Sequence, residues 1–161
     1  MERAGPETLG RPARLYVLTG IPGSGKSTYA RDHLGRCVRV SLDDLRKMMS
    51  GRDWDAYYEP MVAEAGRAVL ETLLARANEV GYDVVLDATN VTRTWRADAI
   101  ERARRHGVEP YSVFVDVPFE VAARRNAARG RVVPEDVLQR FHGQLEPPHV
   151  DEGFVEVIRV G

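Results

Sequence analysis

Short, strongly apolar runs alternate along the chain with longer segments in which apolar residues recur every three or four positions. The first pattern is typical of buried strands, and the second is typical of helices that turn one face towards a core. The longest helical pattern places Met61, Val69 and Leu73 on one face, begins at Pro60 and stops at Gly81. We expect strands at about 15–19, 37–40, 84–86, 113–115 and 154–160. We expect helices at about 24–34, 43–49, 60–80, 94–106, 119–128 and 134–144.

Strands that are separated by helical segments predict a parallel sheet with helices on both faces. The expected fold class is therefore a three-layer α/β fold with a sheet of about five strands. In sheets of this kind, ligands bind at the carboxyl ends of the strands. Polar residues that directly follow a predicted strand are therefore the first candidates for a functional site.

The first thirteen residues contain Gly, Pro and charges of both signs but no apolar block, which predicts a flexible tail over 1–13 without a secretion signal. We expect one domain over 14–161. The chain has 161 residues, a net charge of −1 and a single Cys. The near-neutral charge does not suggest a long nucleic-acid groove. The single Cys favours a reducing compartment, so we expect a cytoplasmic protein. No stretch approaches the ~18 apolar residues of a membrane span.

Of the 23 basic residues, 21 are Arg and only Lys26 and Lys47 are Lys. Lys26 lies in Gly-Ile-Pro-Gly-Ser-Gly-Lys-Ser-Thr (20–28), which follows a predicted strand and fits the phosphate-binding P-loop pattern G-x-x-x-x-G-K-[ST]. Backbone N–H groups of such a loop grip phosphate oxygens, Lys26 adds a slender positive charge, and Ser27 offers a hydroxyl ligand for Mg²⁺. We therefore expect ATP or another nucleoside triphosphate with Mg²⁺. The expected nucleotide-binding residues in this loop are Gly23, Ser24, Gly25, Lys26, Ser27 and Thr28.

Two further strand ends carry polar residues. After the second strand, Asp43 is suited to accept a proton from an attacking hydroxyl, and Arg46, three residues later, is suited to hold an anionic acceptor. A helix cap with a surface ion pair explains the same residues equally well. After the third strand, Asp87 is placed to sit beside Mg²⁺, with Thr89 and Asn90 as acceptor contacts; an Asx turn is the alternative.

Arg125 and Arg129 share a helix face in a segment that ends at Gly130. We expect a lid over about 119–134 whose arginines neutralise the transferred phosphate, although a solvated basic face is the usual explanation of such a run. Trp54, Tyr57 and Tyr58 precede the longest helix. They could stack on an acceptor base, but anchoring of the loop to the core is the favoured interpretation.

Four landmarks together resemble the polynucleotide 5′-kinases, the kinase modules of nucleic-acid end-healing enzymes. They are the loop at 20–28, the Asp43-Asp44-x-Arg46 element, Thr89-Asn90, and the run from Phe114 through Arg125-Asn126-x-x-Arg129-Gly130 to Leu138. The resemblance spans about residues 15–145 and implies a P-loop kinase fold. The residues 87–88, Asp-Ala, depart from the Ser-Asp that precedes Thr-Asn in the phage-type enzyme.

By this resemblance, Lys26 and Ser27 serve the donor phosphates and Mg²⁺, and Asp43 is the general base for a 5′-hydroxyl. Arg46 would grip the acceptor phosphate, and Arg125 and Arg129 would be lid arginines, with Arg129 catalytic. The expected function is Mg²⁺-dependent transfer of a γ-phosphate to the 5′-OH end of DNA or RNA. The residues themselves leave two alternatives: a P-loop kinase for a small metabolite or antibiotic hydroxyl, and a nucleotide-binding module without catalysis. They carry no signal of an oligomeric state.

Overall fold

The computed structural model describes residues 10–130 and 132–161. The strands are β1 (Arg14–Thr19), β2 (Val38–Ser41), β3 (Val84–Asp87), β4 (Glu109–Val115) and β5 (Glu156–Val160). The helices are α1 (Lys26–His33), α2 (Leu42–Ser50), α3 (Glu59–Val80), α4 (Arg93–Arg105), α5 (Phe119–Ala127) and α6 (Glu135–Gln144), with a 3₁₀ turn η1 (Val150–Glu152). Their bounds agree with the prediction to within two residues except at the start of β4, and η1 was not predicted.

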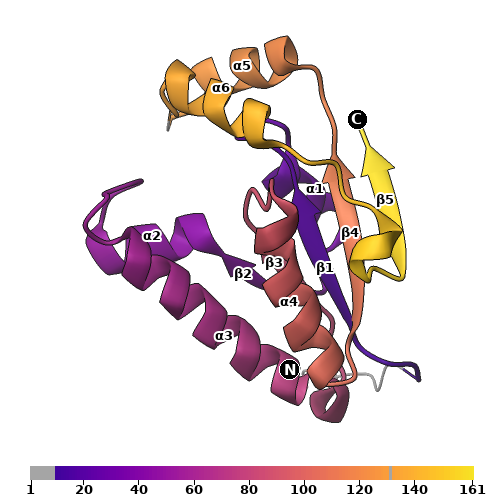
Figure 1. Ribbon diagram of the computed structural model, residues 1–161. Coiled ribbons are helices and arrows are strands. Elements are labelled where there is room, and N and C mark those ends of the chain that lie inside the picture. Colours follow the sequence, from indigo (N-terminus) through magenta and orange to yellow (C-terminus); the bar gives the residue numbers. More distant parts are fainter. Residues whose placement is uncertain (1–9, 131) are drawn as a thin grey trace, which may run out of the picture.

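The five strands form one sheet in the order β2-β3-β1-β4-β5, and every neighbouring pair is parallel (Figure 1). Because all carboxyl ends lie at the same edge, the segments that follow β1, β2, β3 and β4 meet there. The predicted α/β fold with a parallel sheet is confirmed, and this edge is where the site is assembled.

Strand β4 begins four residues before the apolar run that predicted it. The early residues Pro110 and Ser112 interrupt the apolar pattern, yet both are buried and pair with β1. Pairing with β5 starts only at Tyr111, so Pro110 lies near the strand start, where a missing N–H is tolerated. Main-chain pairing with β1, which leaves no trace in local composition, sets this boundary.

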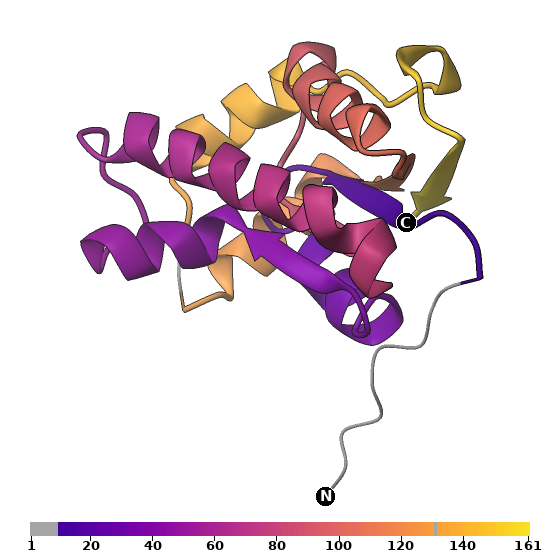
Figure 2. The ribbon, with the colours of Figure 1, turned by 90° about the horizontal axis from the view of Figure 1, so that it is seen from below.

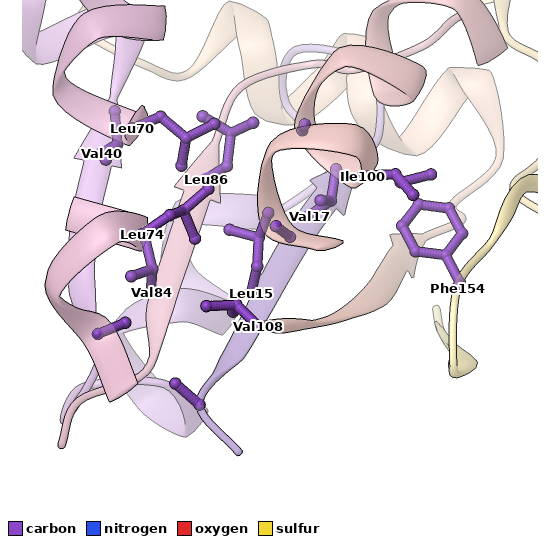
Figure 3. Packing of buried hydrophobic residues seen from close by; sticks show 14 residues of the cluster. Leu15, Val17, Val40, Leu70, Leu74, Val84, Leu86, Ile100, Val108 and Phe154 are labelled. Atoms are coloured by element: carbon purple, nitrogen blue, oxygen red, sulfur yellow. The ribbon is translucent and has the colours of Figure 1, made fainter. Parts of the chain in front are cut away.

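Helices α3 and α4 cover one face of the sheet, and α1 covers the other (Figure 2). On the first face, Leu70 and Leu74 of α3 pack with Leu15 and Val17 of β1 in the largest cluster of buried side chains (Figure 3). Each Leu buried in this way stabilises the fold by about 1.5–3 kcal/mol relative to exposure. The layers hold β1, and therefore the loop that follows it, in a fixed position.

A separate apolar cluster lies at the carboxyl edge, where α5 and α6 extend beyond the strand ends (Figure 1). Ile21 of the P-loop packs there with Ala122 of α5 and Leu138 of α6. The predicted lid segment is therefore joined at its base to the phosphate-binding loop.

Residues 1–9 of the predicted tail lie outside the described residues. The rest of that segment differs from the prediction, because Ala13 is fully buried and its N–H donates to Asn78 Oδ1 at 2.7 Å. Arg11 is also held by Asp83, at 2.7 Å. None of the described helices has the length and apolar character needed to cross a membrane.

Candidate active site

The P-loop connects β1 to α1 and depends on two glycines in the left-handed region. Gly23 and Gly25 have φ values of +83° and +106°, which side chains with a Cβ rarely adopt. A Cβ on Gly23 would also lie 2.4 Å from the carbonyl oxygen of Ala122 in α5. The loop is thus pressed against α5, and this contact requires glycine.

Lys26 is buried at the start of α1, and its Nζ donates to the carbonyl oxygen of Ile21 at 3.0 Å. Burial lowers the pKa of Lys26 to about 8; the negative charges of Asp87 and Asp43 oppose this shift, and the positive charge of Arg129 adds to it. The residues predicted from three strand ends and the lid therefore share one electrostatic neighbourhood. An anionic phosphate beside Nζ would stabilise the charged form and raise this pKa again.

Two features fit the loop to a phosphate group. The buried Oγ of Ser24 lacks a hydrogen-bond partner within the described chain, a state shared there only with Ser112. Buried polar groups of this kind normally find a partner. Ser24 also offers its carbonyl oxygen to Arg125 at 3.0 Å, so the loop is already linked to a lid arginine.

Ser27 and Asp87, the two residues that the sequence predicts beside Mg²⁺, are in contact. Ser27 Oγ donates to Asp87 Oδ2 at 3.0 Å, and the Asp87 side chain is only 5% exposed. No cluster of three or more His, Cys, Asp or Glu side chains in residues 10–130 and 132–161 is arranged for a metal ion. A hydroxyl and one carboxylate instead suit Mg²⁺, which takes few protein ligands and is completed by substrate phosphates and water. Thr28, also predicted, is exposed on α1.

An unpredicted residue, Arg39 of β2, contacts the same carboxylate. Its Nε and Nη2 donate to Asp87 Oδ2 at 3.0 and 2.7 Å, and its Nη1 donates to Asp44 Oδ2 at 2.8 Å. Arg39 lies two residues before Ser41, whose partner in the β2–β3 register is Asp87. Without the register, nothing in the sequence links Arg39 to the end of β3.

The second group of polar residues lies on α2 and α3. Arg46 donates through Nη1 to Asp43 Oδ1 at 2.8 Å and through Nε to Glu59 Oε1 at 2.7 Å. Ser41 caps α2 by accepting from the Asp44 N–H at 3.2 Å. The helix cap and the ion pair that the sequence offered as the alternative explanation are therefore both present, and the catalytic role of Asp43 and the acceptor-binding role of Arg46 stay predictions. Glu59 was missed because thirteen residues separate it from Arg46, and only the return of α3 alongside α2 brings them together.

Thr89 and Asn90 form the turn after β3, beside the start of the P-loop. The Thr89 carbonyl accepts from Gly20 N at 3.0 Å, and Asn90 Nδ2 donates to the Leu18 carbonyl at 2.8 Å. Asn90 is buried and has a φ of +45°, so its side chain holds a tight turn against β1. An acceptor contact from this side chain stays a prediction.

A buried ion pair between α4 and η1 holds that turn in place. Arg96 of α4 is fully buried, donates from Nη1 to the Asn90 carbonyl at 2.9 Å, and pairs with Glu152 at 2.8 Å. Glu152 is in η1, so the segment before β5 fixes the turn after β3. Neither residue was predicted, because 56 positions separate them.

Asn126 of α5 ties the end of this helix to the segment before α6. Its side chain donates to the Val133 carbonyl at 2.7 Å and accepts from the Val133 N–H at 3.0 Å. This double contact fixes the two ends of the segment that carries Arg129 relative to each other.

A family model described as an AAA domain matches residues 15–148. Among curated proteins, the chain is 22% identical over 142 residues to an L-seryl-tRNA(Sec) kinase of Methanococcus maripaludis, covering 83% of this chain and 53% of that protein. It is 31% identical over 133 residues to a protein of Autographa californica nuclear polyhedrosis virus assigned as a bifunctional polynucleotide kinase/RNA ligase. This match covers 75% of this chain and 19% of the viral protein. The chain thus spans about half of the first relative and a fifth of the second.

The solved structures that are similar to this chain also come from proteins with different names and functions. A chain of a Pnkp1/Rnl/Hen1 RNA repair complex superposes with a TM-score of 0.69 at 26% identity, covering 84% of this chain and 44% of that one. A gluconokinase from Sinorhizobium meliloti superposes with a TM-score of 0.59 at 25% identity, covering 92% of this chain and 81% of the gluconokinase chain. The similar proteins therefore share a P-loop kinase fold but differ in acceptor.

Proposed function

The chain belongs to this AAA-domain family of P-loop kinases, and from that membership we propose that it transfers the γ-phosphate of ATP, or of another nucleoside triphosphate, to the 5′-hydroxyl of a DNA or RNA strand. One observation carries the proposal. Ser27 Oγ of the P-loop contacts Asp87 Oδ2 at 3.0 Å, and the negative charges of Asp87 and Asp43 both act on the buried Lys26 of the same loop. The carboxylate suited to the metal and the carboxylate suited to the acceptor therefore belong to the surroundings of one phosphate-binding lysine.

Each group has a task in the transfer. Lys26 and the P-loop N–H groups hold the donor phosphates, Ser27 and Asp87 would hold Mg²⁺, and the ion would neutralise charge on the phosphates. Asp43 accepts the proton of the 5′-hydroxyl, whose oxygen bonds to the γ-phosphorus. The bond from that phosphorus to the β,γ-bridging oxygen breaks, and the nucleoside diphosphate leaves. During the transfer, Arg129 stabilises the negative charge that builds up on the phosphoryl group between the attacking oxygen and the leaving oxygen.

The surface next to the acceptor residues supports an acceptor that carries a base. Trp54 and Tyr57, on the connection between α2 and α3, are 65% and 76% exposed. Tyr58 is half-buried, so the expectation that these aromatic residues anchor the loop in the core is wrong for Trp54 and Tyr57 only. Tyr57 precedes Glu59 by two residues, and Glu59 binds Arg46. Exposed aromatic rings beside a hydroxyl-binding site are suited to stack on nucleobases. Two of the similar proteins are named for RNA repair and for polynucleotide kinase activity.

The test is transfer of label from γ-labelled ATP to a 5′-OH oligonucleotide in the presence of Mg²⁺. We expect Asp43→Asn to lower kcat by about 10²–10⁴-fold, the usual contribution of a general base, while nucleotide binding is retained. Asp32→Asn, on the exposed side of α1, is the matched control and should keep the wild-type rate. A wild-type protein that labels neither DNA nor RNA would overturn the proposal.

A small-molecule acceptor is the second candidate, because the structural match to the gluconokinase covers 81% of that enzyme's chain. A panel of sugars and other alcohols, followed by ADP release, separates the two candidates. Turnover with a sugar and none with oligonucleotides would favour this second function.

A further inference from the structure

We propose that Arg39 is a resident cation of the metal site: it neutralises Asp87 until nucleotide phosphates arrive, so that the site takes up a divalent ion only together with the nucleotide. The proposal rests on the nucleotide-binding half of the proposed function. It does not depend on the identity of the acceptor.

The first argument is the occupation of one oxygen. Asp87 Oδ2 accepts from Ser27 Oγ at 3.0 Å, from Arg39 Nε at 3.0 Å and from Arg39 Nη2 at 2.7 Å. This is the carboxylate oxygen that touches the metal-ligand hydroxyl of Ser27. Its hydrogen-bonding capacity is therefore already used by a positive group.

The second argument is charge. The Asp87 side chain is 5% exposed, and a carboxylate at that depth is costly unless a positive group pairs with it. A divalent ion and Arg39 are both positive, so they compete for the same carboxylate and repel each other. Triphosphate oxygens add the negative charge that lets both cations stay.

The third argument is that Arg39 has a second partner. Its Nη1 donates to Asp44 Oδ2 at 2.8 Å, and Asp44 is in the first turn of α2. A guanidinium has donors enough to keep one carboxylate while it loosens from the other. Because Asp44 is adjacent to Asp43 in α2, Arg39 bridges Asp87 and the helix that carries the proposed base.

The experiment measures Mn²⁺, which prefers the same oxygen ligands as Mg²⁺, by the loss of its free EPR signal in the absence of any acceptor. For the wild-type chain without nucleotide, we expect Mn²⁺ binding to be weak. With a non-hydrolysable ATP analogue, which chelates Mn²⁺ by itself, the loss of free signal is compared with that of the analogue without protein, and the protein should tighten Mn²⁺ binding by at least about tenfold beyond it, the order of effect of one unit charge a few ångströms away. Sub-millimolar binding of Mn²⁺ alone by the wild-type protein would overturn the proposal. This arm needs no variant.

Variants then assign the effect to Arg39. Arg39→Gln keeps a hydrogen-bond donor and Arg39→Met keeps the length, but both remove the charge, and each should bind Mn²⁺ alone about tenfold more tightly than wild type. Arg39→Lys keeps the charge and should behave as wild type. A structural role alone would instead make all three variants alike, and that result would sink the proposal.

Two controls complete the design. Adding Asp87→Asn to Arg39→Gln should abolish the gained Mn²⁺ binding, which places the ion at Asp87. Arg52→Gln removes an exposed arginine that pairs with Asp55 and should leave Mn²⁺ binding unchanged. Failure of the wild-type protein to bind the ATP analogue would count against the proposed function. Unchanged Mn²⁺ binding in Arg39→Gln would count against the resident cation alone.

Discussion

The buried ammonium group of Lys26 lowers the stability of the fold, and Lys26→Met should therefore stabilise the protein at neutral pH. The pKa of Lys26 falls from 10.5 to about 8, chiefly because of burial. A difference of this size corresponds to about 3 kcal/mol against the charged form. The variant also loses the hydrogen bond to the Ile21 carbonyl, which costs about 1 kcal/mol. The expected net gain in the free energy of unfolding is about 2 kcal/mol at pH 7.

The sign of the pH dependence follows from the lowered pKa. Between pH 8 and 10.5, the unfolded chain keeps a proton on Lys26 that the folded chain has lost, so the stability of the wild-type protein rises with pH in this window. Burial raises the pKa of the Cys37 thiol from 9.0 to about 11, which acts in the opposite direction above pH 9. Since Cys37 is common to both proteins, its contribution cancels in the difference between wild type and Lys26→Met.

Urea unfolding of both proteins at several values between pH 7 and 10.5 measures that difference. The advantage of Lys26→Met should be largest at pH 7, shrink as the pH rises and reverse to a deficit of about 1 kcal/mol near pH 10.5, because the wild type regains about 3 kcal/mol once Lys26 is neutral in both states. Lys47→Met, at the only other lysine, is the control; its side chain is 67% exposed, and a change within about 0.5 kcal/mol is expected. If Lys26→Met is no more stable than wild type at pH 7 and the difference does not vary with pH, burial of a charged Lys26 is refuted.

Other predictions follow from single contacts. Nucleotide affinity of the wild-type protein should fall above pH 8, about tenfold per pH unit, with proton uptake on binding detectable by calorimetry in buffers of different ionisation enthalpy. Gly23→Ala should weaken nucleotide binding and lower the melting temperature, because its Cβ would lie 2.4 Å from the Ala122 carbonyl. Leu74→Ala should destabilise the fold by about 2–5 kcal/mol in denaturant unfolding and leave nucleotide affinity unchanged. Glu152→Gln should cost about 3 kcal/mol by the same assay, because it leaves the charge of Arg96 buried without its partner.

The fold was predictable because each element is signalled locally. Gly81 ends α3, Pro118 and Pro134 precede α5 and α6, and the apolar runs of β1 and β3 are short and continuous. The boundary of β4 was missed because strand pairing, and not composition, determines it. Likewise, the exposure of Trp54 depends on how α2 and α3 pack together, and an aromatic side chain alone does not report that.

The residues of the candidate site also divide into those with a local sequence signal and those that depend on the topology. Lys26, Ser27 and Arg46 were predicted because the P-loop and the Asp-x-x-Arg element are contiguous in sequence. Arg39, Glu59 and the Arg96–Glu152 pair were not, since each acts through a partner that the sheet order or a helix return brings near. Residues that carry chemistry leave a local signal, whereas residues that position them are specified by topology.

The phosphate-binding loop contains two buried polar groups that the fold alone accommodates poorly, and this is consistent with a loop built for a ligand. It contains a buried ammonium with a lowered pKa and a buried Ser24 hydroxyl without a hydrogen-bond partner. Each is unfavourable in the protein alone, and each would be relieved by a phosphate oxygen. The binding energy of the nucleotide would therefore offset a cost already present in the fold. The net charge of the whole chain is −1, so attraction for a triphosphate would come from local groups such as Lys26 and Arg129 and not from the overall charge.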